Sequence, residues 1–307
     1  IGTVNSIYTN FSELQKFSKK NNYTDNKKII PDWLEINSLL NIKKLSYNNF
    51  VAEKINGKLI CTDGKLKGEN LTAKSLNGEI YSQFTISEHS QLIKLQSDIS
   101  LKKINIRNSF DAFNNYGQKI IKKEQIKGVG SAEIKIESYW NQSNLKLNTK
   151  KLKINSKLVV EKGELIDFKP LENLSSYVSL NELKHVKFST LENTIDVANE
   201  IITIPTMEIK SSALSVFLSG THTFNQEIDY DITLLLSELL SKSFRKQNTQ
   251  ITEFGEQKQD GKIFNTVYFK MKGSTKKPKI SLNKIRFMED LNNSIIKEKK
   301  YIKNIIQ

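Results

Sequence analysis

The three histidines of the chain, His89, His185 and His222, are the first candidates for acid–base or metal chemistry. None has the spacing of a metal-ligand motif, and none lies beside a nucleophile motif. The chain also has no GxSxG, HExxH or phosphate-binding loop sequence. His222 is expected to be a strand residue near a turn. We therefore predict no catalytic residue, no cofactor and no metal site, and a protein that is not an enzyme.

Two carboxylates, Asp229 and Asp231, are two residues apart and so fall on one face of an extended segment. Such a pair could serve as a general acid and a general base. The alternative, which we favour, is that they belong to a solvated strand face. An envelope enzyme that acts on glycans would need two acidic side chains facing each other across a cleft, about 5 to 10 Å apart.

The formal net charge is +14, and the lysines are scattered along the chain, which is also rich in asparagine and isoleucine. A nucleic-acid surface would instead concentrate basic residues and interleave them with aromatic side chains. We predict no nucleic-acid partner. Cys61 is the single cysteine, so the chain has no internal disulfide, and we expect it to be a small core residue.

The elements that must position these residues are strands. In the stretch 200–241, Ile228, Tyr230, Ile232 and Leu234 alternate with polar residues, as expected for a strand with one dry and one wet face. The same period recurs in three other groups, which are Ile80, Phe84 and Ile86, then Ile134 and Ile136, then Val267, Phe269 and Met271. Leu145 and Leu147 also alternate with polar residues and are assigned to a strand.

Two-residue turns are predicted at Asn56–Gly57, Asn77–Gly78, Asp63–Gly64 and Asp260–Gly261. The fold class predicted from these signals is mainly β, a long curved antiparallel meander that forms a groove-like sheet with a few short helices. We expect helices over about 108–125, after Pro170 and over about 237–244, and one amphipathic helix at the C-terminus. The predicted parts are an N-terminal β-meander (1–107), a β region with crossing helices (108–283) and the terminal helix (284–307).

Several segments, in this order, resemble the C-terminal region of AsmA-like proteins of the Bacteroidetes type. The matching words are SFDAFNNYGQKIIKKEQIKGVGSAEI (109–134), GELIDFKPLENLSSYVSLNELKHVKFSTLENTIDV (163–197), IPTMEIKSSAL (204–214), SGTHTF (219–224), DYDITLLLSELLSK (229–242) and KMKGSTKKPKISL (270–282). The resemblance covers about the last two thirds of the chain.

The resemblance implies a periplasmic protein of a Gram-negative bacterium, held at the inner membrane by an anchor outside these 307 residues. The AsmA-like group is similar to the repeating β-groove lipid transfer proteins. It therefore implies that an apolar groove shelters the acyl chains of phospholipids for transport or outer-membrane homeostasis. The partners implied are a phospholipid or other acyl lipid, the inner membrane and envelope proteins.

The residues predicted to line such a groove are those on the cleanest apolar faces. They are Ile80, Phe84, Ile86, Ile134, Ile136, Leu145, Leu147, Ile228, Tyr230, Ile232, Leu234, Val267, Phe269 and Met271. Two alternatives stay open, since alternation does not separate a lining from a packed core. These side chains can form an ordinary core, or the protein can be a structural module that docks envelope proteins without carrying lipid.

Overall fold

A computed structural model describes residues 2–6, 9–10, 28–168, 184–211, 215–235 and 266–283. Its strands are β1 (Gly2–Ser6), β2 (Thr9–Asn10), β3 (Ile36–Tyr47), β4 (Phe50–Thr62), β5 (Lys65–Ser75), β6 (Gly78–His89), β7 (Leu92–Asn105), β8 (Ile126–Asn141), β9 (Lys153–Ile166), β10 (His185–Ala198), β11 (Ile201–Lys210), β12 (Ser215–Thr223), β13 (Glu227–Leu235), β14 (Thr266–Ser274) and β15 (Lys279–Leu282). The α-helix of the described ranges is α2 (Ile106–Ala112), and 3₁₀ turns lie at η1 (Asn114–Gly117), η2 (Lys123–Gln125) and η3 (Thr149–Lys151).

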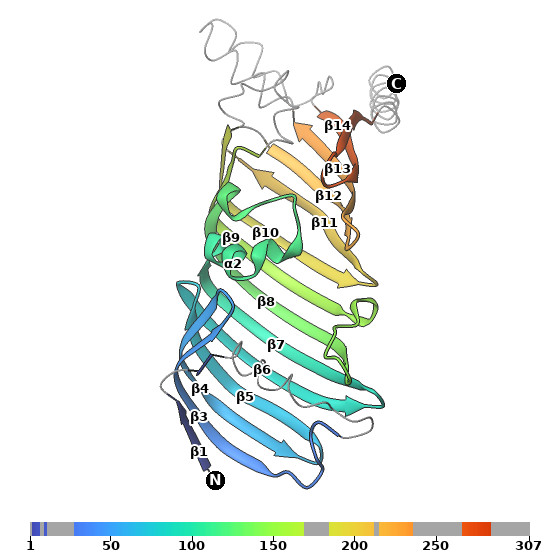
Figure 1. The fold of residues 1–307 in the computed structure, drawn as a ribbon. Coiled ribbons are helices and arrows are strands. Elements are labelled where there is room, and N and C mark those ends of the chain that lie inside the picture. Colours follow the sequence, from blue (N-terminus) through green and yellow to red (C-terminus); the bar gives the residue numbers. More distant parts are fainter. Residues whose placement is uncertain are drawn as a thin grey trace, which may run out of the picture.

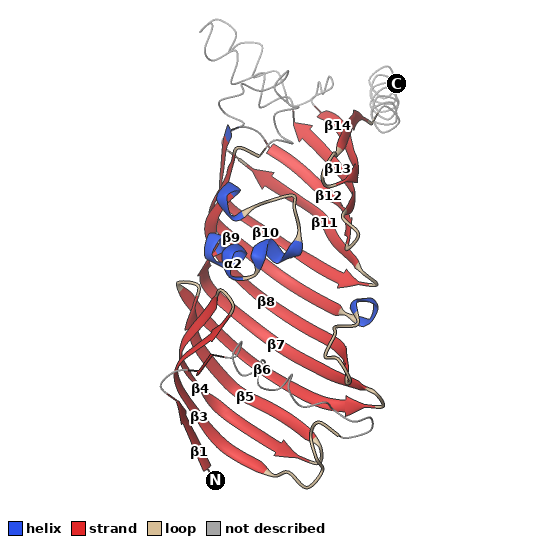
Figure 2. Cartoon of the chain, viewed as in Figure 1, coloured by secondary structure: helices blue, strands red, loops and turns tan. Residues whose placement is uncertain are grey.

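All these strands belong to one sheet whose order follows the chain from β3 to β15 (Figures 1 and 2). Every neighbouring pair from β3 to β15 is antiparallel, whereas β1 and β2 both pair with β3 in parallel. The sheet does not close on itself within the described residues. The prediction of a mainly β antiparallel meander is confirmed. The boundary predicted after residue 107 falls in α2, and the strands on its two sides, β7 and β8, are neighbours.

Cross-strand glycines make room for aromatic rings in three places along the sheet. Gly68 lies opposite Phe84, and a methyl group on Gly68 would be 2.4 Å from the Phe84 ring. The same arrangement joins Gly163 to Phe188 at 2.0 Å and Gly220 to Tyr230 at 2.5 Å. A glycine in a strand packs no side chain of its own, so a ring laid over it restores buried contact.

The helix predicted over 108–125 is shorter than expected. α2 begins after Asn105, whose side-chain oxygen accepts a 3.0 Å hydrogen bond from the backbone N–H of Asn108, and the helix ends at Ala112. The next turn is left-handed, with positive φ at Asn114, Asn115, Tyr116 and Gly117. The prediction is wrong beyond Ala112 because this run of residues cannot continue a right-handed helix.

The turn predicted at Asn56–Gly57 is also wrong, since both residues lie inside β4 at an irregularity of its pairing with β5. A Cβ atom at Gly57 would lie 2.6 Å from the Leu71 side chain, so this glycine allows a close approach between strands. The turn at Asp63–Gly64 joins consecutive strands, as predicted, whereas the turn predicted at Asn77–Gly78 is shifted by one residue to Leu76–Asn77, and Gly78 begins β6.

The remaining predicted elements lie outside the described residues. They are the turn at 260–261, the helices after Pro170 and over 237–244, and the C-terminal helix 284–307. No helix in the described ranges has the length and apolar character needed to cross a bilayer.

Candidate functional site

Strand register places the apolar residues of β6 and β8 on one face of the sheet. Residues opposite each other in an antiparallel pair project to the same side. Phe84 lies opposite Ser97 of β7, which in turn lies opposite Ile136 of β8. Ile134 continues the same face through Ser156 of β9 to Ile195 of β10. Ile80 and Ile86 are on the Phe84 face of β6, because they differ from it by an even number of residues.

The same face continues to the end of the sheet. Val197 of β10 lies opposite Ile202, which pairs with His222, which pairs with Ile228 of β13. Two cross-strand pairs extend it from β13 into β14, and they are Tyr230 with Met271 and Ile232 with Phe269. Eleven of the fourteen residues predicted to line a groove therefore belong to one side of the sheet, which we call the apolar face.

An apolar pocket of about 500 Å³ lies on this face between β7 and β15. Six of the predicted residues line it, namely Ile134, Tyr230, Ile232, Leu234, Phe269 and Met271. Part of its wall comes from the segment between β7 and β8, through Phe110, Tyr116, Ile120 and Ile121. A pocket of this size falls within the range of small-molecule sites.

The degree of burial changes along the apolar face. At the β13–β14 end, Ile228, Tyr230, Leu234, Phe269 and Met271 are all buried, and Leu234 is 0% exposed. Over β6 and β8 the predicted residues Ile80, Phe84, Ile86, Ile134 and Ile136 are only partly buried. Such side chains contact their neighbours on the sheet and keep some of their surface uncovered. A uniformly packed core would leave no such difference.

Leu145 and Leu147 do not form a strand, and that part of the prediction is wrong. Leu145 lies in a loop after β8 and is 51% exposed, and Leu147 makes an isolated bridge to Trp140. The loop satisfies its own N–H groups, because the Asn141 side chain accepts from Ser143 N at 2.9 Å and the Asn144 side chain accepts from Lys146 N at 2.9 Å. Local bonds of this kind compete with a strand ladder.

Val267 is in β14 as predicted, and its side chain lies outside the described residues. Cys61 is a free, buried residue, which confirms its assignment to the core.

His222 is buried within the apolar face, at 5% exposure, between Ile202 and Ile228. Its Nε2 atom has no hydrogen-bond partner among the described residues, and burial lowers the pKa of the imidazole. The sequence correctly placed it in a strand near a turn, but it did not indicate which face the ring occupies. His185 is exposed, with its Nδ1 3.0 Å from Glu164 Oε1.

Asp229 and Asp231 share a lysine on the opposite, polar face. Lys270 Nζ lies 2.6 Å from Asp229 and 3.1 Å from Asp231, and Lys272 Nζ lies 3.0 Å from Asp229. The 2.6 Å contact is an ion pair that lacks the directed geometry of a hydrogen bond. Lys270 first, and then Lys272, hold the pKa of Asp229 below its ordinary value. A general acid needs the opposite shift, so this geometry fits the solvated-face interpretation.

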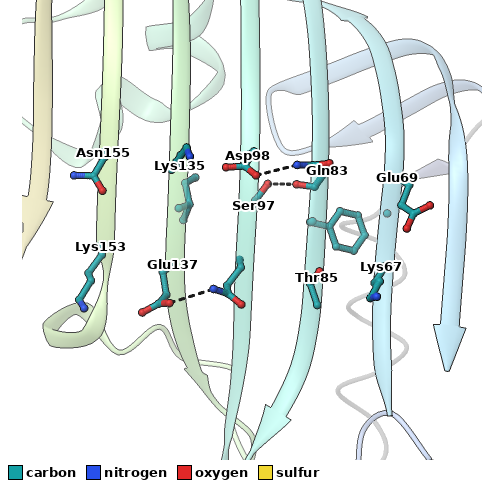
Figure 3. Close-up of a pocket in the computed structure, with 14 residues that line it drawn as sticks. Lys67, Glu69, Gln83, Thr85, Ser97, Asp98, Lys135, Glu137, Lys153 and Asn155 are labelled. Atoms are coloured by element: carbon teal, nitrogen blue, oxygen red, sulfur yellow. Dashed lines mark hydrogen bonds between the residues drawn. The ribbon is translucent and has the colours of Figure 1, made fainter. Parts of the chain in front are cut away.

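The polar face also carries a wide, shallow pocket of about 590 Å³ across β5 to β9 (Figure 3). Its charges are mixed, since Lys67, Lys135 and Lys153 lie among Glu69, Asp98 and Glu137. Gln83 donates a 3.0 Å hydrogen bond to Asp98, and Lys94 lies 3.0 Å from Glu137. Positive and negative side chains alternate with one another here, which leaves little net field for a charged ligand.

Several residues that line the apolar pocket were not predicted. Leu158 and Val160 of β9 and Ile195 of β10 follow the same alternation as the chosen strands, so that signal was present in the sequence. Phe110 and Ile120 lie on the apolar stripe of the helix predicted over about 108–125, and they reach the face from the segment before β8.

Searches against protein-family models, curated proteins and solved structures each found no match to this chain.

Proposed function

We propose that this chain is the C-terminal part of an AsmA-like periplasmic protein that shelters acyl chains on its apolar face. The observation that carries the proposal is the apolar face itself, which runs from strand to strand without a change of side. The partly buried isoleucines and Phe84 of β6 and β8 support it further, because they leave apolar surface available to a guest.

The energy at stake favours a continuous path. Moving two acyl chains of about sixteen carbons each through water would cost on the order of 25 kcal/mol, at about 0.8 kcal/mol per methylene. A face built from thirteen strands, β3 to β15, is about 58 Å long at roughly 4.8 Å per strand spacing. One leaflet of hydrocarbon is about 15 Å thick, so an acyl tail would cover about three strands and could move from one set to the next.

In this proposal the sheet curves into a groove, with the apolar face inward and the ion-paired face toward water. The function requires no reacting group, and the protein is non-catalytic. Its cargo is a phospholipid or another acyl lipid, and its place is the periplasm, anchored at the inner membrane through a segment outside these residues. The resemblance described above supports this location and the link to the outer membrane.

The test compares lipid carried by matched variants of the purified chain. Ile134→Asn puts an amide on the apolar face, and its neighbour Lys135→Asn puts the same group on the polar face. Native mass spectrometry before and after delipidation should show bound phospholipid in the wild type and in Lys135→Asn, with at least about tenfold weaker retention in Ile134→Asn. Far-UV circular dichroism checks that both variants fold.

Two results would count against lipid handling. The first is a wild-type chain that retains no phospholipid and takes none from vesicles. The second is equal retention by both variants. An absence of lipid together with tight, saturable binding of an envelope protein would favour the docking module instead.

A further inference from the structure

The segment between β7 and β8, residues 106–125, crosses the apolar face, and we call it the crossing segment. Figure 1 shows α2 and the loop after it lying over the sheet near β9 and β10. Phe110, Tyr116, Ile120 and Ile121 from this segment line the apolar pocket together with the strands. Ile120 also packs against the buried cluster of Ile228, Tyr230 and Met271, more than a hundred residues further along the chain.

Polar bonds fasten the crossing segment at its base, beside the sheet. Arg107 donates to the carbonyl oxygens of Ile126 and Glu124, at 3.3 and 3.2 Å. Further out, the Gln118 side-chain oxygen accepts from Ile120 N at 2.7 Å and from Ile121 N at 3.0 Å. Within the described part of the chain, the hydrogen bonds of residues 113–123 stay inside the segment. The contact that this outer part makes with β13 and β14 is therefore apolar.

The sequence Lys119–Ile120–Ile121–Lys122 combines two chemistries at the pocket. Both isoleucines line the pocket, whereas both lysines are exposed. Neither lysine has an ion-pair partner among the residues that the structure describes. A hydrocarbon chain that enters beside this sequence would leave its polar end next to two uncompensated positive charges, which favours an anionic head over a neutral one.

Tyr116 adds a neutral polar group to the same wall. Its hydroxyl shares a hydrogen bond with the buried Ser109. Burial raises the pKa of the phenol, and the bond with Ser109 opposes that rise. The phenol is therefore uncharged at neutral pH and does not repel an anionic head.

We infer that the pocket under the crossing segment binds one hydrocarbon chain of an anionic amphiphile, whose acidic head lies beside Lys119 and Lys122. The inference rests on the proposed function, since it assigns one binding site and a charge preference to an apolar face that shelters acyl chains. A free fatty acid and an anionic phospholipid share this chemistry, and the experiment separates them.

The experiment uses the delipidated full chain and three probes, namely palmitate, palmitoyl-oleoyl phosphatidylglycerol and the matching phosphatidylcholine. Binding is measured by displacement of a fluorescent fatty acid and, independently, by native mass spectrometry. The variants are Lys119→Gln/Lys122→Gln and Ile120→Ser. Lys43→Gln/Lys74→Gln is the charge-matched control, because both lysines are exposed on β3 and β5.

The wild type should bind at least one anionic probe more tightly than phosphatidylcholine. Lys119→Gln/Lys122→Gln should raise the Kd for that probe roughly three- to tenfold and leave the Kd for phosphatidylcholine unchanged. Ile120→Ser should weaken all probes that bind, by up to about tenfold. Palmitate bound alone would identify a free fatty acid as the source, and phosphatidylglycerol bound alone would identify a phospholipid.

Failure of the inference differs from failure of the proposed function. Two results would overturn the site for an anionic head and leave the proposed lipid sheltering intact. One is wild-type binding without a preference for anionic probes. The other is an equal loss of affinity for the anionic probe in the Lys43→Gln/Lys74→Gln control. No binding of any probe by the wild type would overturn both.

Discussion

Replacing Gly163 by alanine should destabilise the sheet because of one specific clash. The new Cβ atom would lie 2.0 Å from two ring carbons of Phe188, which is buried and directly opposite in the β9–β10 pair. Overpacking a buried contact costs about 1–3 kcal/mol. The lower entropy of the unfolded alanine chain offsets about 0.4–1 kcal/mol of that. We expect the free energy of unfolding to fall by up to about 2.6 kcal/mol, with a mid-range value of about 1.3 kcal/mol.

Gly130→Ala is the matched control. Its nearest contact would be 3.2 Å, to the Ile106 side chain, and its backbone is not left-handed. Its cost should stay within about 0.5 kcal/mol. Urea unfolding followed by circular dichroism measures both variants, and with a slope of about 2 kcal/mol per molar a cost of about 1.3 kcal/mol should lower the midpoint of Gly163→Ala by about 0.65 M.

Phe188→Leu tests the cause, because it removes the ring that the new methyl group would meet. In a double-mutant cycle, Gly163→Ala should cost less in the Phe188→Leu background, with a coupling energy of about 1 kcal/mol. Equal costs for Gly163→Ala and Gly130→Ala, or no coupling with Phe188→Leu, would refute the idea that glycine makes room for the ring.

Three further predictions concern ionisation and backbone strain. Burial lowers the pKa of His222 in the folded chain, so as pH falls below about 6.5 the imidazole takes up a proton in the unfolded chain but not in the folded one. The free energy of unfolding should therefore decrease in acid. His222→Leu should flatten the pH dependence of the urea midpoint. Lys270→Met should cost about 0.5–1 kcal/mol at pH 7, since the Asp229 and Asp231 side chains that it pairs are about one third exposed. Because the pKa of Asp229 is lowered in the folded chain, its contribution to the free energy of unfolding is present above about pH 4 and is lost as pH falls through the folded pKa. The difference in free energy of unfolding between wild type and Lys270→Met should therefore shrink as the pH is lowered. Asn114 has a φ of 48°, a left-handed conformation that strains alanine but not glycine. Asn114→Ala should therefore lower the melting temperature, and Asn114→Gly should not. Equal melting temperatures of the two variants would argue against strain in this turn.

The sequence was most informative where one strand alternates cleanly. The strand and the face of Ile228, Tyr230 and Ile232 could be predicted from the local sequence alone, because these residues alternate with aspartates at a period of two. Short turns with a left-handed requirement, such as Asp63–Gly64, were equally readable. Asn56–Gly57 gives a similar turn signal but allows a close approach to Leu71 inside a strand, and only the neighbouring strand reveals that role.

The pocket was harder to predict, because its wall joins distant parts of the chain. Nothing local to Ile120 indicates that it will pack against Tyr230 and Met271. The prediction of a crossing helix over about 108–125 placed Ile120 and Ile121 on its apolar stripe, but it did not indicate which strands they contact. A left-handed turn supported by the Asn115 and Gln118 side chains redirects the segment instead.

The strand order also determines how this architecture can change in length. From β4 onward, each strand that the structure describes has its ladder hydrogen bonds only with the strands immediately before and after it in the chain. An added or deleted hairpin would preserve strand direction and the side on which each residue projects, so the remaining pairs would keep their register. Outside the crossing segment, which joins the β7–β8 region to β13 and β14, stability in such a ladder is close to a sum of nearest-neighbour contributions, as in solenoid repeats. The molecule can therefore be lengthened in units of two strands, each unit extending the same surface by about 10 Å.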